Sequence, residues 1–139
     1  GVETFYLNLA TNTEAMRVAA LENATTTMNI SDMQDILTDL MQNSKIQESS
    51  ILAEYVQSKL VSGLRENMYS TTDLGVKQAP FYVLIGAEMP AILAEISFIS
   101  NPQDAKRLRQ EQYLEEIARH IAAGIAGNVD HQATAALQM

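Results

Sequence analysis

The sequence predicts an α/β fold: a three-layer sandwich with helices on both faces of a mixed or parallel sheet, from which the first strands are missing. Strand-like runs are separated by stretches with helical periodicity, which is the pattern of this class. Few strand-like runs accompany several helices, and two of these runs are apolar enough to need cover on both faces. We therefore expect the 139 residues to belong to one domain whose sheet is incomplete.

The N-terminal half of the chain predicts one strand followed by helices. Residues 3–9 are rich in aromatic and β-prone side chains and predict a strand. Thr11 begins a capping box, which predicts a helix to about Asn23. Ser31 begins a second capping box, which predicts another helix. An apolar stripe with helical spacing follows it, formed by Met33, Ile36, Leu37, Leu40 and Met41.

A third helix is expected after Ser49 and Ser50. Its apolar face consists of Leu52, Tyr55, Val56, Leu60 and Leu64. Residues 67–80 are polar and contain chain breakers, so they predict an irregular connection.

The remaining elements follow in the C-terminal half. Residues 81–85 and 91–99 are predicted strands, separated by a turn. Asn101 and the proline after it fit the N-cap and first position of a short helix. A long amphipathic helix is expected from about Gln112 to Ala126. We expect residues 129–139 to form a flexible tail.

Composition excludes several classes of function. The net charge of −8 argues against binding of nucleic acid through a broad basic face, and against docking on anionic lipid. The chain has no cysteine, and therefore no disulfide or thiolate metal site. No segment is long and apolar enough to predict a membrane span.

Glu95 is the strongest candidate for chemistry. It lies within the apolar run 89–102, where an unpaired carboxylate would be costly. The side chain must therefore be neutral, paired with a cation, or placed at the open end of a strand facing a site. A structural ion pair with Lys77 or Arg107 is one interpretation, because such pairs also perturb pKa values.

Six segments of the chain, in order, resemble the zinc-dependent N-acetylmuramoyl-L-alanine amidases, which trim bacterial peptidoglycan. They read G-V-E-T-F-Y-L (1–7), E-N-A (22–24), G-V-K-Q-A-P-F-Y-V-L (75–84), M-P-A-I-L (89–93), E-I-S-F-I-S-N (95–101), and the closing helix with Tyr113, Ile117 and Gly124. The match covers residues 1–128 and implies the C-terminal part of one catalytic domain.

The resemblance implies an activity, a cofactor and a role for Glu95. Members of the family hydrolyse the amide between N-acetylmuramic acid and the L-alanine of the stem peptide, using water activated by zinc. Glu95 corresponds to the glutamate that accepts the proton of that water and returns one to the leaving amine. Peptidoglycan would be the substrate, and the protein would act in the periplasm, in the cell envelope or after secretion.

The zinc ligands of the family are not in this chain. In relatives they lie in D-P-G-H-G-G and S-I-H-A-N motifs, and neither motif occurs here. Zinc needs three protein ligands and an open position. His120 is explained by its place in the last helix, and His131 by a place in the tail, so neither is expected to bind metal. We therefore expect the zinc ligands to lie upstream and the chain alone to be inactive.

The resemblance also implies a regulatory segment at about residues 24–57. Cell-division amidases carry a helical insert here that covers the zinc cleft until an activator protein displaces it, and that supplies a glutamate to the metal. Glu14 and Glu22 are both candidates for that glutamate, and spacing does not choose between them. The apolar stripe of this segment is expected to face the core.

Two functions remain open on the sequence alone. The chain is either part of a zinc amidase or a non-catalytic module that binds peptidoglycan or a division protein. Retention of Glu95 favours the enzyme, because a pure binding module has no need for it. An incomplete sheet also predicts self-association of the chain, with a homo-oligomer as one outcome and aggregation as another.

Overall fold

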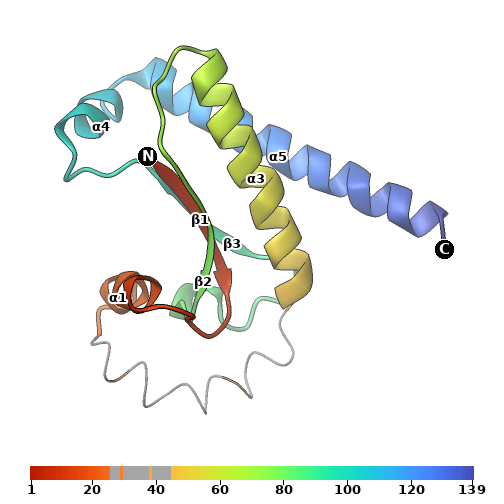
Figure 1. The fold of residues 1–139 in the computed structure, drawn as a ribbon. Helices are drawn as coiled ribbons and strands as arrows, with labels where there is room; N and C mark the ends of the chain where they lie inside the picture. Colours follow the sequence, from red (N-terminus) through yellow and green to blue (C-terminus); the bar gives the residue numbers. More distant parts are fainter. Residues whose placement is uncertain (26–28, 30–37, 39–44) are drawn as a thin grey trace.

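The computed structural model describes residues 1–25, 29, 38 and 45–139. Its strands form one mixed sheet in the order β2–β1–β3, with helices packed against it (Figure 1). The elements are β1 (Val2–Leu7), α1 (Thr13–Glu22), α3 (Ile46–Glu66), β2 (Asp73–Ala79), the 3-10 turn η1 (Tyr82–Leu84), β3 (Ile92–Ile96), α4 (Pro102–Arg107) and α5 (Glu111–Leu137). This confirms the α/β class.

Strand β1 lies at the centre of the sheet and fixes its register. It runs parallel to β2, with Phe5 opposite Lys77. It runs antiparallel to β3, with Glu3 opposite Glu95 and Phe5 opposite Leu93. Because side chains alternate between the two faces of a strand, Glu3, Phe5, Leu93 and Glu95 share one face of the sheet.

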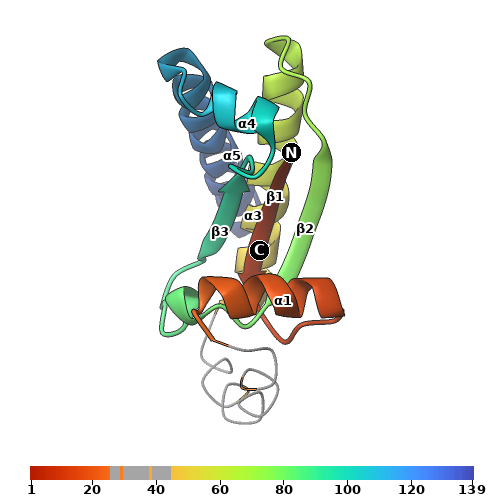
Figure 2. The ribbon, with the colours of Figure 1, turned by 90° about the vertical axis from the view of Figure 1, so that its left-hand side faces the viewer.

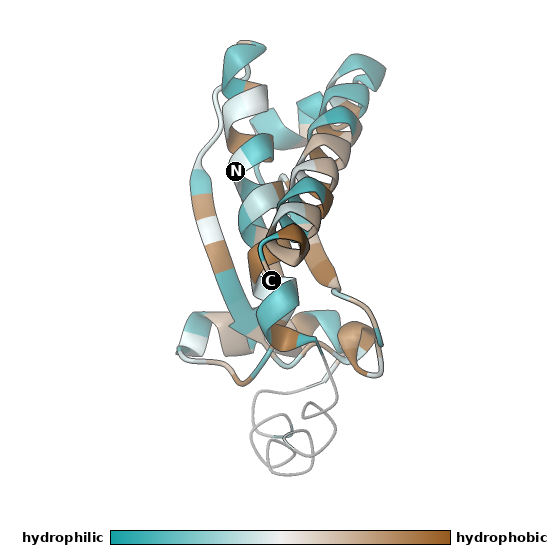
Figure 3. Ribbon diagram, turned by 90° about the vertical axis from the view of Figure 1, so that its right-hand side faces the viewer, coloured by the Kyte–Doolittle hydropathy of each residue, from teal (hydrophilic) through white to brown (hydrophobic). Residues whose placement is uncertain are grey.

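Helices α3 and α5 cover the other face and pack against each other (Figures 1 and 2). Their shared core with the sheet contains Val2, Val56, Leu60, Leu64, Tyr113 and Ile117. Hydrophilic and hydrophobic residues alternate along both helices, as expected when one side of a helix is buried (Figure 3). None of the described helices combines the length and apolar character that a bilayer crossing needs.

Helix α1 packs on the face that carries Glu3 and Glu95, at the end of the sheet opposite α4 (Figure 2). Its small residues Ala15, Ala19 and Ala20 are buried against β1 and the segment around η1. Phe5 and Phe81 meet edge to face there, with 4.9 Å between their ring centroids. The sheet thus has helices on both faces, as the sequence predicts.

Two predicted strand positions were wrong. Residues 73–79, expected to be irregular, form β2, and residues 81–85, expected to be a strand, contain η1. The side chain of Asn23 holds the chain at η1: its amide donates to the Pro80 carbonyl (2.9 Å) and its oxygen accepts from the Tyr82 N–H (2.9 Å). These bonds occupy backbone groups that a strand would use.

Several element ends also differ from the predictions. Asn12, not Thr11, caps α1, by accepting from the Ala15 N–H. Helix α3 begins at Ile46, and Ser49, expected before the helix, lies inside it and accepts from the Ala91 N–H. Strand β3 ends at Ile96, because Ser97 adopts a φ of 82°.

Helix α5 is longer than predicted. It was expected to end at about Ala126 but continues to Leu137. Residues 129–137 of the expected tail are therefore helical, and the ring of His131 lies 5.7 Å from that of Tyr55. Flexibility of residues 129–139 stays a prediction.

The helix expected after Ser31 lies outside the described residues, together with its apolar stripe. The second part of the predicted insert, residues 46–57, is the first half of α3. Ala53, Val56 and Gln57 are buried there, and α3 contacts β1 extensively. This half belongs to the scaffold of the sheet.

Helices α3 and α5 approach closely at glycines. A Cβ atom on Gly124 would lie 2.7 Å from the Cα of Val56, and one on Gly63 would overlap the ring of His120. A Cβ on Gly127, one turn beyond Gly124, would meet only the ring of Tyr55, at 3.1 Å. The backbones are therefore in direct contact at Gly124.

Gly124→Ala should destabilise the chain by about 1–3 kcal/mol, because the added methyl group must push two helix backbones apart. Gly127→Ala is the matched control: it gains the same helix propensity, about 0.5–1 kcal/mol, without a backbone clash. Urea unfolding of both variants measures the difference. Equal stability of the two would contradict this packing.

We also expect the 139-residue chain to self-associate. Strands β2 and β3 are the outer strands of the described sheet, each with one edge that pairs with no described strand. Such edges recruit other chains. Sedimentation over a concentration series should show mass increasing with concentration. A stable monomer at high concentration would show that these edges are protected.

Candidate functional site

The candidate site is a cluster of charged side chains on the sheet face that also carries α1. Glu95 is half-buried near the end of β3, directly across from Glu3 on the central strand. Glu3 is only 4% exposed. Its carboxylate accepts a hydrogen bond from the Lys77 ammonium of β2 at 2.7 Å. Three neighbouring strands thus each contribute one ionisable group.

The pKa of Glu95 is raised to about 7. Burial is the largest cause, followed by the negative charge of Glu3, a hydrogen bond between the two carboxyl groups, and the charge of Glu22. The ammonium of Lys77 acts in the opposite direction. At neutral pH both the protonated and the ionised form of Glu95 are therefore populated.

Glu95 borders an open hollow of about 340 Å³ at the end of β3. The other lining residues are Glu22, Leu93, Ala94, Ser97, Phe98, Ile99 and Ser100. Of the two glutamates that the sequence left as alternatives, Glu22 lines this hollow and Glu14 does not. A larger hollow, about 760 Å³, lies between the start of α3 and the end of α5, away from this cluster.

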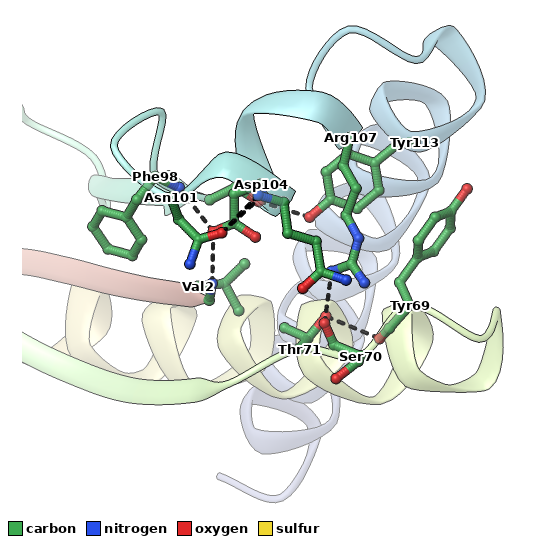
Figure 4. Close-up of polar contacts among 12 residues, drawn as sticks. Val2, Tyr69, Ser70, Thr71, Phe98, Asn101, Asp104, Arg107 and Tyr113 are labelled. Atoms are coloured by element: carbon green, nitrogen blue, oxygen red, sulfur yellow. Dashed lines mark hydrogen bonds and ion pairs between the residues drawn. The ribbon is translucent and has the colours of Figure 1, made fainter.

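The segment that follows Glu95 is held in place by several hydrogen bonds (Figure 4). The hydroxyl groups of Ser97 and Tyr113 lie 2.6 Å apart. Asp104 accepts from the Phe98 N–H at 3.1 Å, and Asn101 caps α4 by accepting from the Gln103 and Asp104 N–H groups. The wall of the hollow is therefore anchored to α4 and α5.

The structural interpretation of Glu95 named the wrong partners. Lys77 pairs with Glu3, and Arg107 donates to the Ser70 carbonyl at 2.7 Å (Figure 4). The residue directly across from Glu95 is Glu3. Sequence reasoning missed Glu3 as a site residue. The available signal was a second carboxylate in a strand-like apolar segment, at the third residue of the chain.

The described residues do not fit a zinc site. They contain no group of three or more histidine, cysteine, aspartate or glutamate side chains placed to hold a metal ion. His120 lies on α5, within hydrogen-bonding distance of Asn67 (3.1 Å) and beside Glu116 (3.3 Å). Neither His120 nor His131 lines the Glu95 hollow.

Known sequences that resemble this chain include several N-acetylmuramoyl-L-alanine amidases. The profile of the N-acetylmuramoyl-L-alanine amidase family matches residues 1–127. The chain is 42% identical to N-acetylmuramoyl-L-alanine amidase LytC of Bacillus subtilis over 76 residues, which are 55% of this chain and 14% of LytC. It is 32% identical to the amidase AmiC of Escherichia coli O6:H1 over 124 residues, covering 84% of this chain and 28% of AmiC.

Solved structures show the same fold. An N-acetylmuramoyl-L-alanine amidase from Clostridium difficile 630 is 25% identical, with a TM-score of 0.58 over 94% of this chain and 48% of that protein. The CwlD amidase of Clostridioides difficile, solved in complex with the GerS lipoprotein, has a TM-score of 0.59 at 21% identity, over 94% of this chain and 46% of CwlD. The chain thus spans less than half the length of these relatives.

Proposed function

The chain belongs to the N-acetylmuramoyl-L-alanine amidase family, and from that premise we propose that it forms part of a peptidoglycan hydrolase domain. Its substrate is the amide bond between N-acetylmuramic acid and the L-alanine of the stem peptide. The observation that carries the proposal is Glu95, a half-buried carboxyl group with a pKa near 7 beside an open hollow. A general acid–base group works best when its pKa is close to the operating pH.

Glu95 acts on the proton of the attacking water. In its ionised form the carboxylate accepts that proton as the water oxygen bonds to the amide carbon. In its protonated form it donates the proton to the nitrogen as the carbon–nitrogen bond breaks. The products are the carboxylic acid of the lactyl group and a peptide with a free L-alanine amine. Glu95 lies on β3, and the segment 97–104 that follows it is held by hydrogen bonds, so the position of its carboxyl group is fixed.

We propose that the zinc implied by the family is held by residues outside this chain, since the described residues do not supply a ligand set. The proposal places the complete protein in the periplasm or cell envelope, or outside the cell, where it acts on the wall during division or autolysis. The direct test incubates the complete protein with purified sacculi and measures new N-terminal L-alanine. Release of reducing sugar without free L-alanine would instead indicate a glycosidase.

We also propose that residues before α3 cover the site in a resting state and are displaced by an activator protein. Glu22 supports a regulatory contact here, because it ends α1 at the hollow that Glu95 borders. Residues 46–57 form the first half of α3 and include side chains buried against the sheet, so they are not free to cover the site. We therefore limit the covering segment to the part before Ile46.

Replacing residues 26–44 with a short glycine–serine linker in the complete protein should raise basal hydrolysis of sacculi, because the cover is lost while α1 and α3 are kept. The control substitutes glycine and serine for the exposed residues 133–137 at the end of α5, away from the Glu95 hollow. Equal or lower activity of a folded linker variant would show that the segment is scaffold.

A further inference from the structure

We propose that Glu3, anchored by Lys77, is a positioning residue that orients the carboxyl group of Glu95 at the hollow and holds a proton on it. The inference rests on the proposed role of Glu95 in proton transfer. It adds a residue pair that acts through Glu95 without touching the substrate. Three observations carry it: strand register, burial and the placement of the lysine.

Register places the two carboxyl groups face to face. Glu3 and Glu95 are direct cross-strand partners on β1 and β3, so their side chains lie at neighbouring positions on one face of the sheet. A hydrogen bond between two carboxyl groups requires one proton between them, because an ionised carboxylate only accepts. The pair therefore holds one proton and one negative charge when it is bonded.

The backbone around Glu3 is fixed from the opposite face of the sheet. Gln57 of α3 donates to the Val2 carbonyl at 2.9 Å and accepts from the Thr4 hydroxyl at 2.9 Å. Gln57 and Thr4 are buried, and Glu3, which lies between Val2 and Thr4 on β1, is buried on the other face of the sheet. Glu3 is thus a rigid partner, whereas Glu95 is half-exposed at the hollow.

Lys77 decides which carboxyl group carries the charge. Its ammonium lies 2.7 Å from Glu3, and its side chain is 24% exposed. A cation in contact with Glu3 favours the negative charge there. The shared proton then lies on Glu95, which donates its hydroxyl hydrogen to Glu3. The groups that face Glu95 are therefore Glu3 from β1, Lys77 from β2 and Glu22 from α1.

This arrangement gives Glu95 both states that amide hydrolysis needs. The hydrogen bond to Glu3 fixes the orientation of the protonated carboxyl group, which is the donor form. When Glu95 loses its proton, two carboxylates face each other, and repulsion from Glu3 favours recapture of a proton. Glu3 therefore makes the carboxylate of Glu95 a stronger base than an isolated surface glutamate.

The experiment measures the titration of Glu95 directly, by carbon-13 NMR of glutamate-labelled 139-residue chain. Glu3→Gln should lower the pKa of Glu95 by about 1 unit or more, because the negative neighbour is removed. Lys77→Met should move part of the shared proton from Glu95 to Glu3, because the cation that favours the negative charge on Glu3 is lost, so the titration curve of Glu95 should change. Glu22→Gln is the matched control, which removes a charge at the hollow without a hydrogen bond to Glu95, and should shift the pKa less than Glu3→Gln.

An unchanged Glu95 pKa in Glu3→Gln, or an equal shift in Glu22→Gln, would overturn the inference. If Glu3→Gln does not fold, Lys77→Met decides, and an unchanged pKa in that variant also overturns it. In the active complete protein, the acid limb of the pH profile of kcat should move to lower pH in Glu3→Gln. A complete protein that hydrolyses no amide, with the titration shifts as expected, would reject the proposed function and leave the carboxyl pair intact.

Discussion

Glu95→Gln in the complete protein should lower the rate of amide hydrolysis by about 10²- to 10⁴-fold, which is the usual contribution of a general acid–base group. Glutamine keeps the shape of the side chain but cannot accept the proton of the attacking water. The release of N-terminal L-alanine from sacculi measures the rate, and metal content is determined on the same sample. Near-normal activity in the variant would return Glu95 to a structural role.

Thermal unfolding tests whether the lower rate of Glu95→Gln results from unfolding of the variant. The pKa of Glu95 is raised from its ordinary value of 4.5 to about 7, so the folded chain binds more protons than the unfolded chain between these values. The wild type therefore loses stability as pH rises from about 4.5 to 7. Glu95→Gln lacks this cost, so its melting temperature relative to the wild type should rise over that interval.

The candidate residue Glu95 could be named from the sequence, whereas its neighbours in the sheet could not. Glu95 stands out because a carboxylate in an apolar strand needs a physical reason, and that reasoning is local. Its partner Glu3 lies more than ninety positions away, and only the pairing of β1 with β3 brings them together. Lys77 was named as a possible partner of Glu95, but the register places it on Glu3.

The misassigned strands show where local pattern fails. Segment 73–79 is polar, contains a glycine and ends before a proline, so its own preference for a strand is weak. It becomes β2 because β1 offers a parallel partner. Residues 81–85 are more apolar, but they form a turn, and the side chains of Phe81 and Leu84 are buried in the core from that turn. The turn is held by a hydrogen bond from the Tyr82 N–H to the side chain of Asn23. Tertiary contacts outweighed propensity in both cases.

The predicted end of α5 was wrong for a similar reason. Helix α5 continues past Ala126 although it contains Gly124 and Gly127, and glycine usually weakens a helix. Gly124 lies where the backbones of α5 and α3 cross closely, and the need for a missing side chain there is not revealed by any periodicity of apolar residues. In contrast, Asn101 and Pro102 predicted the start of α4 correctly, because capping depends only on neighbouring residues.

Absence of catalytic activity is expected for the 139-residue chain by itself. The 139 residues should have no hydrolytic activity on peptidoglycan, even with added zinc. A catalytic zinc site needs three protein ligands and one open position for water. The described residues provide no such group, and the two histidines of the chain lie on α5, away from the Glu95 hollow. Glu95 alone would then face a water molecule that is too weak an acid to transfer its proton.

Turbidity of purified sacculi and release of N-terminal L-alanine test this expectation, with the complete protein as the positive control. Circular dichroism of the chain must show helical structure, because an unfolded chain would be inactive for a trivial reason. Addition of zinc should leave its melting temperature unchanged, since a bound ion would stabilise the folded state. Hydrolysis by the folded chain would mean that its own residues suffice for catalysis and that the proposed division of the active site is wrong.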